Sequence, residues 1–318
     1  MSSNAITSAG SIVTRADLET SLAALGKEIH EPRHGIHGPN SPAWRAHREI
    51  IVFLGGLRAA LMQLAHPFVA HGIDQHSTTR KDVLARFHRT FLHIFAMTFG
   101  DRDHAFRAAR KVYTIHQRIT GTINEDVGRF RCGDPYAAND VDALLWVWAT
   151  LVHTVVAVDR LLPDAMNPQQ RESYYRATWA FVRLFGVPPG RIPPNWNAFD
   201  TYVQNMLSSD TIAVGGPARA MARFLLTPKH PAYTAAMKWA TIVSTGLLPE
   251  QLREAYGLRF GATEQALFRI SSAAIGCIYP AIPSALRLLP AYQRAMHRLG
   301  GRAPSRVSLY LERKFDLL

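Results

Sequence analysis

Apolar and polar positions in this chain follow a helical period almost throughout. The clearest case runs from Asp82 to Gly121, where two amphipathic segments meet at Gly100-Asp101 and repeat their apolar residues every three or four positions. The same spacing predicts further helices, near 14–26, 45–72, 143–158, 168–186, 217–227, 231–244, 249–257, 262–275 and 288–299. No stretch alternates strictly between apolar and polar residues, so we expect 124–142 to be a connecting loop without strands. The pattern predicts an all-α fold, with a single large helical domain at 14–318 and a disordered tail at 1–13.

Three local signals shape these helices. Thr14 followed by Asp17 predicts a capping box at the first helix. Pro67 predicts a break or kink in the 45–72 segment, because proline disrupts the preceding helical turn. The Gly55-Gly56 pair permits close approach of another backbone or of a ligand.

One face of the first amphipathic helix is polar where an apolar stripe is expected. Its members recur at i, i+3, i+4, i+7 and i+11, and they are Arg86, Arg89, Thr90, His93 and Met97. Aromatic and aliphatic residues flank the stripe: Phe87, Phe91, Ile94, Phe95 and Phe99. The second helix then places His116 where a core residue is usual. These residues together indicate a pocket.

A flat, apolar, anionic cofactor matches such a pocket best. Haem needs a neutral imidazole for iron, cations for its propionates and an apolar slot for its ring. The residues alone leave a second interpretation open, in which His116 is a hydrogen-bonded core histidine and the arginine stripe is a solvated face.

Charge narrows the class of partner. Thirty-six Lys and Arg against 24 Asp and Glu give a net charge of +12 and a pI near 10.1. Such a balance is compatible with nucleic acid, an anionic membrane surface or an acidic ligand. The arginines are scattered along helices, and the chain has no Lys-rich tail or recognised nucleic-acid module. We therefore expect ligand-binding arginines and general surface charge, and no nucleic-acid partner.

The compartment is inferred from cysteines and apolar runs. Cys132 and Cys277 lie far apart and resemble neither a disulfide framework nor a metal cluster. The N-terminus lacks the basic and apolar regions of a signal peptide. The longest apolar run, Ala143 to Val158, contains His153 and is shorter than a membrane span, so we interpret it as a buried helix. We expect a cytoplasmic protein without a transmembrane segment.

Other histidines give a weak metal signal. His34 and His37 lie in a loop with no neighbouring ligands. His66, His71 and His76 are five residues apart and would not share one helical face. We expect their segment to be a loop that packs over a pocket mouth. A di-iron centre is disfavoured, because the Glu-x-x-His pairs of helical di-iron sites are missing.

Several segments, taken in order, resemble one family. They are LGGLRAALMQLAHPFVAHGIDQHS, RFHRTFLHIFAMTFG, VYTIHQRITG, DPYAANDVDALLWVWATLV and YYRATWAFVRLFGVP. This succession resembles the MpaB-type oxygenases, whose rubber-cleaving members are called latex-clearing proteins, and the resemblance runs from about Gly38 to Arg298.

The resemblance implies a helical domain around a buried pocket for haem b, with iron held by one proximal histidine and O₂ activated on the open face. Arg86-Phe87-His88-Arg89-Thr90 matches the family's Arg-x-x-Lys-Thr stretch, which makes Arg86 and Thr90 catalytic pocket residues. His116 then falls at the proximal ligand, with Arg86, Arg89, Thr90 and His93 also lining the cofactor site. Arg89 replaces the Lys of rubber oxygenases and suits a propionate clamp, because guanidinium stays charged. Trp148 stands where many relatives carry His.

The expected function is therefore a haem-dependent oxygenase that takes O₂ and a hydrophobic, unsaturated or isoprenoid small molecule. Rubber is not expected as the substrate, because a cytoplasmic enzyme cannot reach an extracellular polymer. A haem peroxidase, a haem or gas sensor and a cofactor-free lipid-binding module remain as alternatives. The oligomeric state is open, with a homodimer as one option.

Overall fold

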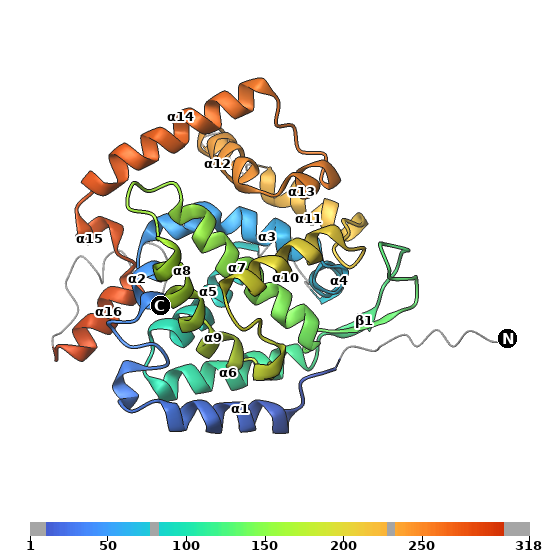
Figure 1. Ribbon diagram of the computed structural model, residues 1–318. Helices are drawn as coiled ribbons and strands as arrows, with labels where there is room; N and C mark the ends of the chain where they lie inside the picture. The colour runs from blue at the N-terminus through green and yellow to red at the C-terminus, as the bar shows by residue number, and fades with distance from the viewer. Residues whose placement is uncertain (1–10, 77–82, 228–232, 302–318) are drawn as a thin grey trace.

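The computed structural model describes residues 11–76, 83–227 and 233–301, and for residues 83–89 the backbone alone. The protein is mostly helical, at 69% helix, which confirms the predicted fold class in its coarse form. Figure 1 shows the helices gathered around α3 and α7. The long helices are α1 (Arg15–Glu28), α3 (Gly56–Leu64), α4 (Pro67–His76), α5 (Val83–Phe99), α6 (Arg102–His116), α7 (Val141–Asp159), α8 (Pro168–Ala177), α10 (Trp196–Ser208), α11 (Gly216–Leu226), α12 (Thr234–Leu247), α14 (Ala262–Ile278) and α16 (Pro290–Leu299).

Short elements connect them. They are η1 (Pro32–His34), α2 (Pro42–His47), η2 (Ile50–Gly55), α9 (Trp179–Arg183), η4 (Pro189–Arg191), α13 (Glu250–Ala255), η6 (Tyr279–Ala281) and α15 (Ser284–Arg287).

Helix α7 lies at the centre of the fold, as the apolar run predicts. Asp140 starts it by accepting a hydrogen bond from the Ala143 backbone N–H at 2.9 Å. Most of its residues are buried, and the Trp146 indole N–H donates to the Met62 carbonyl of α3 at 3.0 Å. Gly55 permits the crossing of η2 over α7, because a Cβ there would lie 2.3 Å from Thr154 Cγ2. The predicted close approach at this glycine is confirmed.

Local signals set two other helix boundaries. Thr14 and Asp17 form the predicted capping box, in which each side chain bonds the other residue's backbone N–H. The helical path bends by 98° between 50–64 and Pro67–His76, which confirms the predicted break at Pro67.

The expectation of a strand-free connection after α6 is wrong. Strands β1 (Thr120–Thr122) and β2 (Pro135–Ala137) pair antiparallel, with Gly121 opposite Tyr136. A Cβ at Gly121 would lie 2.5 Å from the Gln75 side-chain oxygen and 2.8 Å from the Tyr136 hydroxyl, so a larger residue would displace these two side-chain ends. The small hairpin therefore fixes the end of α6 against α4.

Among the described residues, α7 is the one unbroken helix whose length and composition would suit a membrane span, and the bent pair before α5 also meets those criteria. The apolar window of α7 is 67% buried inside the protein. Core helices of this kind meet the same criteria.

Candidate functional site

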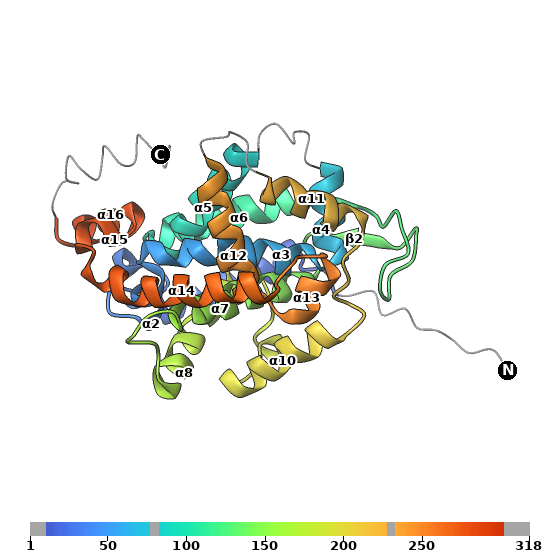
Figure 2. The same ribbon diagram turned by 90° about the horizontal axis from the view of Figure 1, so that it is seen from above.

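Helices α5 and α6, which the sequence predicts on either side of Gly100-Asp101, pack side by side (Figure 2). The turn between them depends on Gly100 and Asp101. A Cβ at Gly100 would lie 2.2 Å from the Ala96 carbonyl oxygen, so a larger residue would not fit. The Asp101 carboxylate then accepts from the His104 backbone N–H at 2.8 Å and starts α6.

The polar stripe of α5 runs from solvent into the core. Arg86 and Arg89 lie in its first two turns, where only the backbone is described. Thr90 is exposed, His93 is half-buried and Met97 is fully buried. Its described side chains therefore run from the surface at Thr90 to the main apolar core at Met97.

His116 is the last residue of α6 and is half-buried. It lies on the helical face of Ala105, Ala109 and Val112, because positions 105, 109, 112 and 116 share one side of a helix. Ala105 and Ala109 are buried in the main core. The imidazole thus belongs to the inward side of α6, at its carboxyl end.

His93 adds a second imidazole near α6. Burial lowers the pKa of His93, and the nearby Lys111 cation lowers it further. His93 is therefore neutral near pH 7. It can accept or donate a hydrogen bond there, and the positive charge at this face comes from Lys111.

A cavity of about 450 Å³ opens beside the end of α6. Its walls combine three bases with aliphatic carbons, and the described residues that line it are His76, Lys111, Thr114, Ile115, Arg118 and Ile119, none of them acidic. His76 is held in place because its Nε2 lies 2.9 Å from the Thr120 carbonyl oxygen. The cavity suits a ligand with an apolar body and a negative charge, and His116 itself is not part of its lining.

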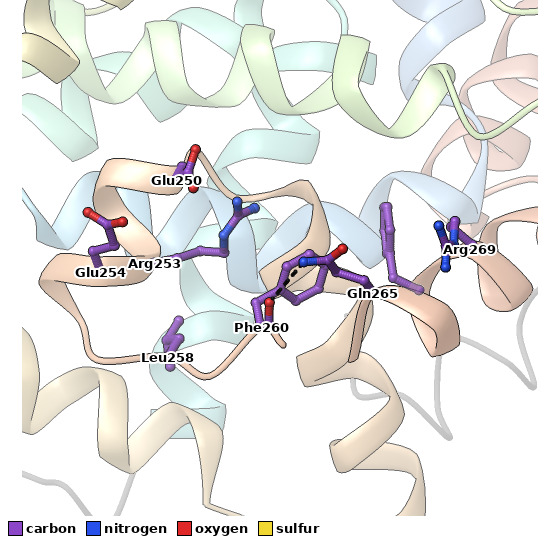
Figure 3. Close-up of a pocket in the computed structure, with 8 residues that line it drawn as sticks. Glu250, Arg253, Glu254, Leu258, Phe260, Gln265 and Arg269 are labelled. Atoms are coloured by element: carbon purple, nitrogen blue, oxygen red, sulfur yellow. Dashed lines mark hydrogen bonds between the residues drawn. The ribbon is translucent and has the colours of Figure 1, made fainter. Parts of the chain in front are cut away.

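A second cavity of about 450 Å³ lies between α13 and the start of α14 (Figure 3). It mixes Glu250 and Glu254 with Arg253 and Arg269. Arg253 is already engaged, because it donates to the Leu248 carbonyl at 2.9 Å and lies over the Phe260 ring at 4.7 Å. Its mixed charge and engaged arginine make it a poorer candidate site than the basic cavity.

His66 and His71 have structural roles. The prediction that their segment is a loop is wrong, since Pro67–His76 forms α4. His66 Nδ1 accepts from the Phe68 backbone N–H at 3.2 Å, and burial, aided by Arg129, lowers its pKa to about 3. His71 is buried with Nε2 2.7 Å from Asn124 Oδ1. Of the three, His76 lines the basic cavity. In the part of the chain that the structure describes, no three His, Cys, Asp or Glu residues gather as metal ligands.

Sequence reasoning missed a buried polar cluster between α3 and α7. Arg58 is 1% exposed and donates from Nε to the Leu247 carbonyl at 2.7 Å. Its guanidinium also bonds the Thr154 hydroxyl, and Nη2 lies 2.8 Å from His153 Nδ1. Burial, then Arg58 and Arg160, lower the pKa of His153 to about 3, so its Nδ1 is a neutral acceptor. The arginine within an otherwise apolar GGLRAALMQL run was the available signal.

Trp148, where the resemblance leads one to expect histidine, is a core residue. It is 2% exposed and packs against Tyr175 and Phe199, with ring centroids 5.8 Å and 5.5 Å away. Its indole carries no iron-binding nitrogen, so this position supplies no second axial ligand.

Comparison with known proteins yields a family match that spans α5, α6 and α7. The family described as "ER-bound oxygenase mpaB/B'/Rubber oxygenase, catalytic domain" matches residues 44–276. The uncharacterized proteins Mb2261 of Mycobacterium bovis and Rv2237 of Mycobacterium tuberculosis are each 23% identical over 215 residues, which cover 65% of this chain and 81% of the relative. No solved structure matches this chain.

Proposed function

Since this chain belongs to the mpaB/B' and rubber oxygenase catalytic-domain family, we propose that it is a haem b-dependent oxygenase with His116 as the axial iron ligand. The proposed substrates are O₂ and a hydrophobic, unsaturated or isoprenoid small molecule. The observation that carries the proposal is the place of His116, half-buried on the inward face of α6 within the matched region.

The surrounding residues fit haem in their chemistry. A histidine ligates iron through a neutral imidazole nitrogen, and His116 offers an imidazole on the inward side of α6. Arg86 and Arg89 occupy the first turns of α5, and cations of this kind would hold the two propionates. Lys111 and Arg118 line the basic cavity, which opens on another face of α6 from His116. Ile115 and Ile119 give the same cavity an apolar side for the substrate.

Haem, when bound, supplies the oxygen chemistry, and the protein supplies position and electrostatics. We propose Arg86 and Thr90 as the catalytic groups, with Arg86 placing a fixed positive charge near the oxygen that reacts. Neutral His93 can orient a polar group without adding charge. The aliphatic walls would exclude water and hold the substrate's unsaturated carbon chain.

The test is haem content measured in matched variants. Protein purified from haem-supplemented cells should show a Soret band and about one haem per chain by pyridine haemochrome, the ratio expected for one axial histidine. His116→Ala should lose the stoichiometric haem while its circular dichroism stays helical. His104→Ala is the matched control, since it lies on the same helix with an exposed side chain.

Unchanged haem content in His116→Ala would remove the ligand assignment. Wild-type protein that stays colourless and takes up no added hemin would favour a cofactor-free lipid-binding module. In haem-loaded protein, Arg86→Ala should keep haem and lose O₂-dependent turnover of unsaturated lipids. Turnover with peroxide in place of O₂ would instead indicate a peroxidase.

A further inference from the structure

Helix α14 exposes an apolar face that no other described element covers. Leu267, Ile270 and Ile278 are 43%, 65% and 62% exposed, and no residue of this 17-residue helix is buried. With Ala274, they are spaced by three or four residues and form one stripe. After Gln265, Arg269 is the one charged residue among the exposed positions of α14. An isolated exposed aliphatic residue is ordinary, but a continuous stripe indicates a binding surface.

A neighbouring face of α14 attaches the helix to the protein. Phe268 packs into the notch at Gly246 of α12, where a Cβ would lie 2.3 Å from its ring. The Trp239 indole N–H donates to Ser271 Oγ at 3.1 Å. Figures 1 and 2 show α14 at the edge of the molecule, with α12 between it and α3. The apolar stripe therefore faces outward.

Exposed apolar residues concentrate in this part of the chain. Of the 11 large hydrophobic residues that are exposed in the described structure, seven lie between Tyr233 and Met296. Trp239, which is 41% exposed, lies beside α14, and Leu286, which is 59% exposed, follows on α15. A tryptophan with an apolar body and a polar N–H is typical of the membrane–water interface.

The net charge of the same region indicates which kind of partner can cover the apolar stripe. Between Thr211 and Gly301 the chain carries ten Lys and Arg against three Glu, a net charge of 10 − 3 = +7. From Gln265 to Leu311 it has no acidic residue. A second copy of the chain would bring an equally positive surface against this one and be repelled. An anionic surface with an apolar interior complements both the charge and the stripe.

We propose that the stripe of Leu267, Ile270, Ala274 and Ile278 inserts into the headgroup region of an anionic phospholipid membrane. Helix α14 lies parallel to the surface, with its aliphatic side chains in the acyl boundary and Lys238 and Arg269 near the phosphates. This docking does not depend on haem or on turnover, and it goes beyond the proposed oxygenase activity. It would place the enzyme on the phase in which a hydrophobic substrate dissolves.

Vesicle flotation of the full-length protein tests the proposal. Wild-type protein should float with vesicles of phosphatidylcholine and phosphatidylglycerol, stay in solution with phosphatidylcholine alone, and bind less as salt screens the charges. The double variant Ile270→Ser, Ile278→Ser should weaken binding about tenfold or more, because two aliphatic side chains no longer leave water. The matched control is Ile12→Ser, since Ile12 is 57% exposed and lies before α1. It should bind as wild type does.

Three outcomes would overturn the proposal. Wild-type protein that does not float with anionic vesicles has no such surface. Equal flotation of the double variant and wild type would show that the docking face lies elsewhere on the protein. Lipid-free wild-type protein that sediments as a dimer, together with a double variant that sediments as a monomer, would assign the stripe to self-association. Thermal melts by circular dichroism should agree for all three proteins, because the changes lie at exposed positions.

Discussion

Helices α7 and α14 have similar length but opposite surroundings. Helix α7 has 19 residues and is buried on most sides, whereas α14 has 17 residues and none is buried. Each helix packs closely against a glycine of a neighbouring element, α7 against Gly55 and α14 against Gly246. The difference lies in what covers the remaining faces. Apolar residues in a helix therefore predict that one of its faces is buried. Which partner covers that face depends on how the helix packs in the fold.

The two helices also differ in polar neighbours. Several imidazoles lie around α7: His66 after α3 is buried, and His153 on the helix and His47 are partly buried. His47 Nε2 lies 3.0 Å from the Tyr174 hydroxyl. Burial lowers the pKa of His153 and His66 to about 3 and of His47 to about 4. The outward face of α14 carries only Arg269 as a charged group. Acid should therefore act on the α7 core.

The largest predicted effect is acid destabilisation. In the folded protein these histidines stay neutral until about pH 4, whereas in the unfolded chain they bind protons near the ordinary pKa of 6.5. Between those values the unfolded chain binds more protons, so the free energy of unfolding falls as pH falls. Each histidine contributes up to about 1.4 kcal/mol per pH unit. Urea unfolding between pH 6.5 and about 5.5, above the range where most carboxylates titrate, measures the slope.

The variant His153→Gln should reduce that slope by the contribution of one bound proton, roughly 1.4 kcal/mol per pH unit. A wild-type free energy of unfolding that is flat across this range would show that the buried histidines are not held neutral.

The second prediction concerns the crossing at Gly55. Gly55→Ala places a methyl group 2.3 Å from Thr154 Cγ2 and 2.8 Å from Val158 Cγ2, on a helix fixed from several sides. We expect a loss of about 3 kcal/mol in the free energy of unfolding, typical of overpacking in a rigid core. Gly56→Ala is the neighbouring control, because no described atom lies within 4 Å of the place its methyl group would take and its backbone is helical. It should be neutral or stabilise by about 0.5 kcal/mol. Similar losses in both variants would contradict the close crossing.

Features encoded within a few residues could be predicted from sequence. The Thr14 capping box, the turn at Gly100-Asp101, the break at Pro67 and the close approach at Gly55 each depend on one residue's backbone preference or on a short spacing. The hairpin could not be predicted this way. Strands of three residues are too short to show alternation, and β1 pairs with β2 across an intervening loop.

The candidate site was predictable only in its helical part. Helical spacing places His116 on the inward face of α6 and joins His93 to Met97 on α5. The basic cavity required the fold, because His76 of α4 reaches it through the Thr120 carbonyl. Arg58 and His153 meet across 95 positions, a pairing that no local pattern encodes. The outward direction of α14 likewise depends on its contacts with α12.

The smallest predicted effect tests whether α14 is attached more loosely than α7. Gly246→Ala puts a methyl group 2.3 Å from the Phe268 ring, which is as close as the clash at Gly55. Phe268 is only partly buried and its helix lies at the edge, so the ring and α14 can shift outward. We expect a loss of about 1 kcal/mol in urea unfolding, the low end for overpacking, with faster hydrogen exchange confined to α14. Adding Phe268→Leu should remove most of this loss, because the clash needs the ring. A loss equal to that of Gly55→Ala would mean that α14 is held as rigidly as α7, and that its exposed stripe is presented on a fixed part of the core.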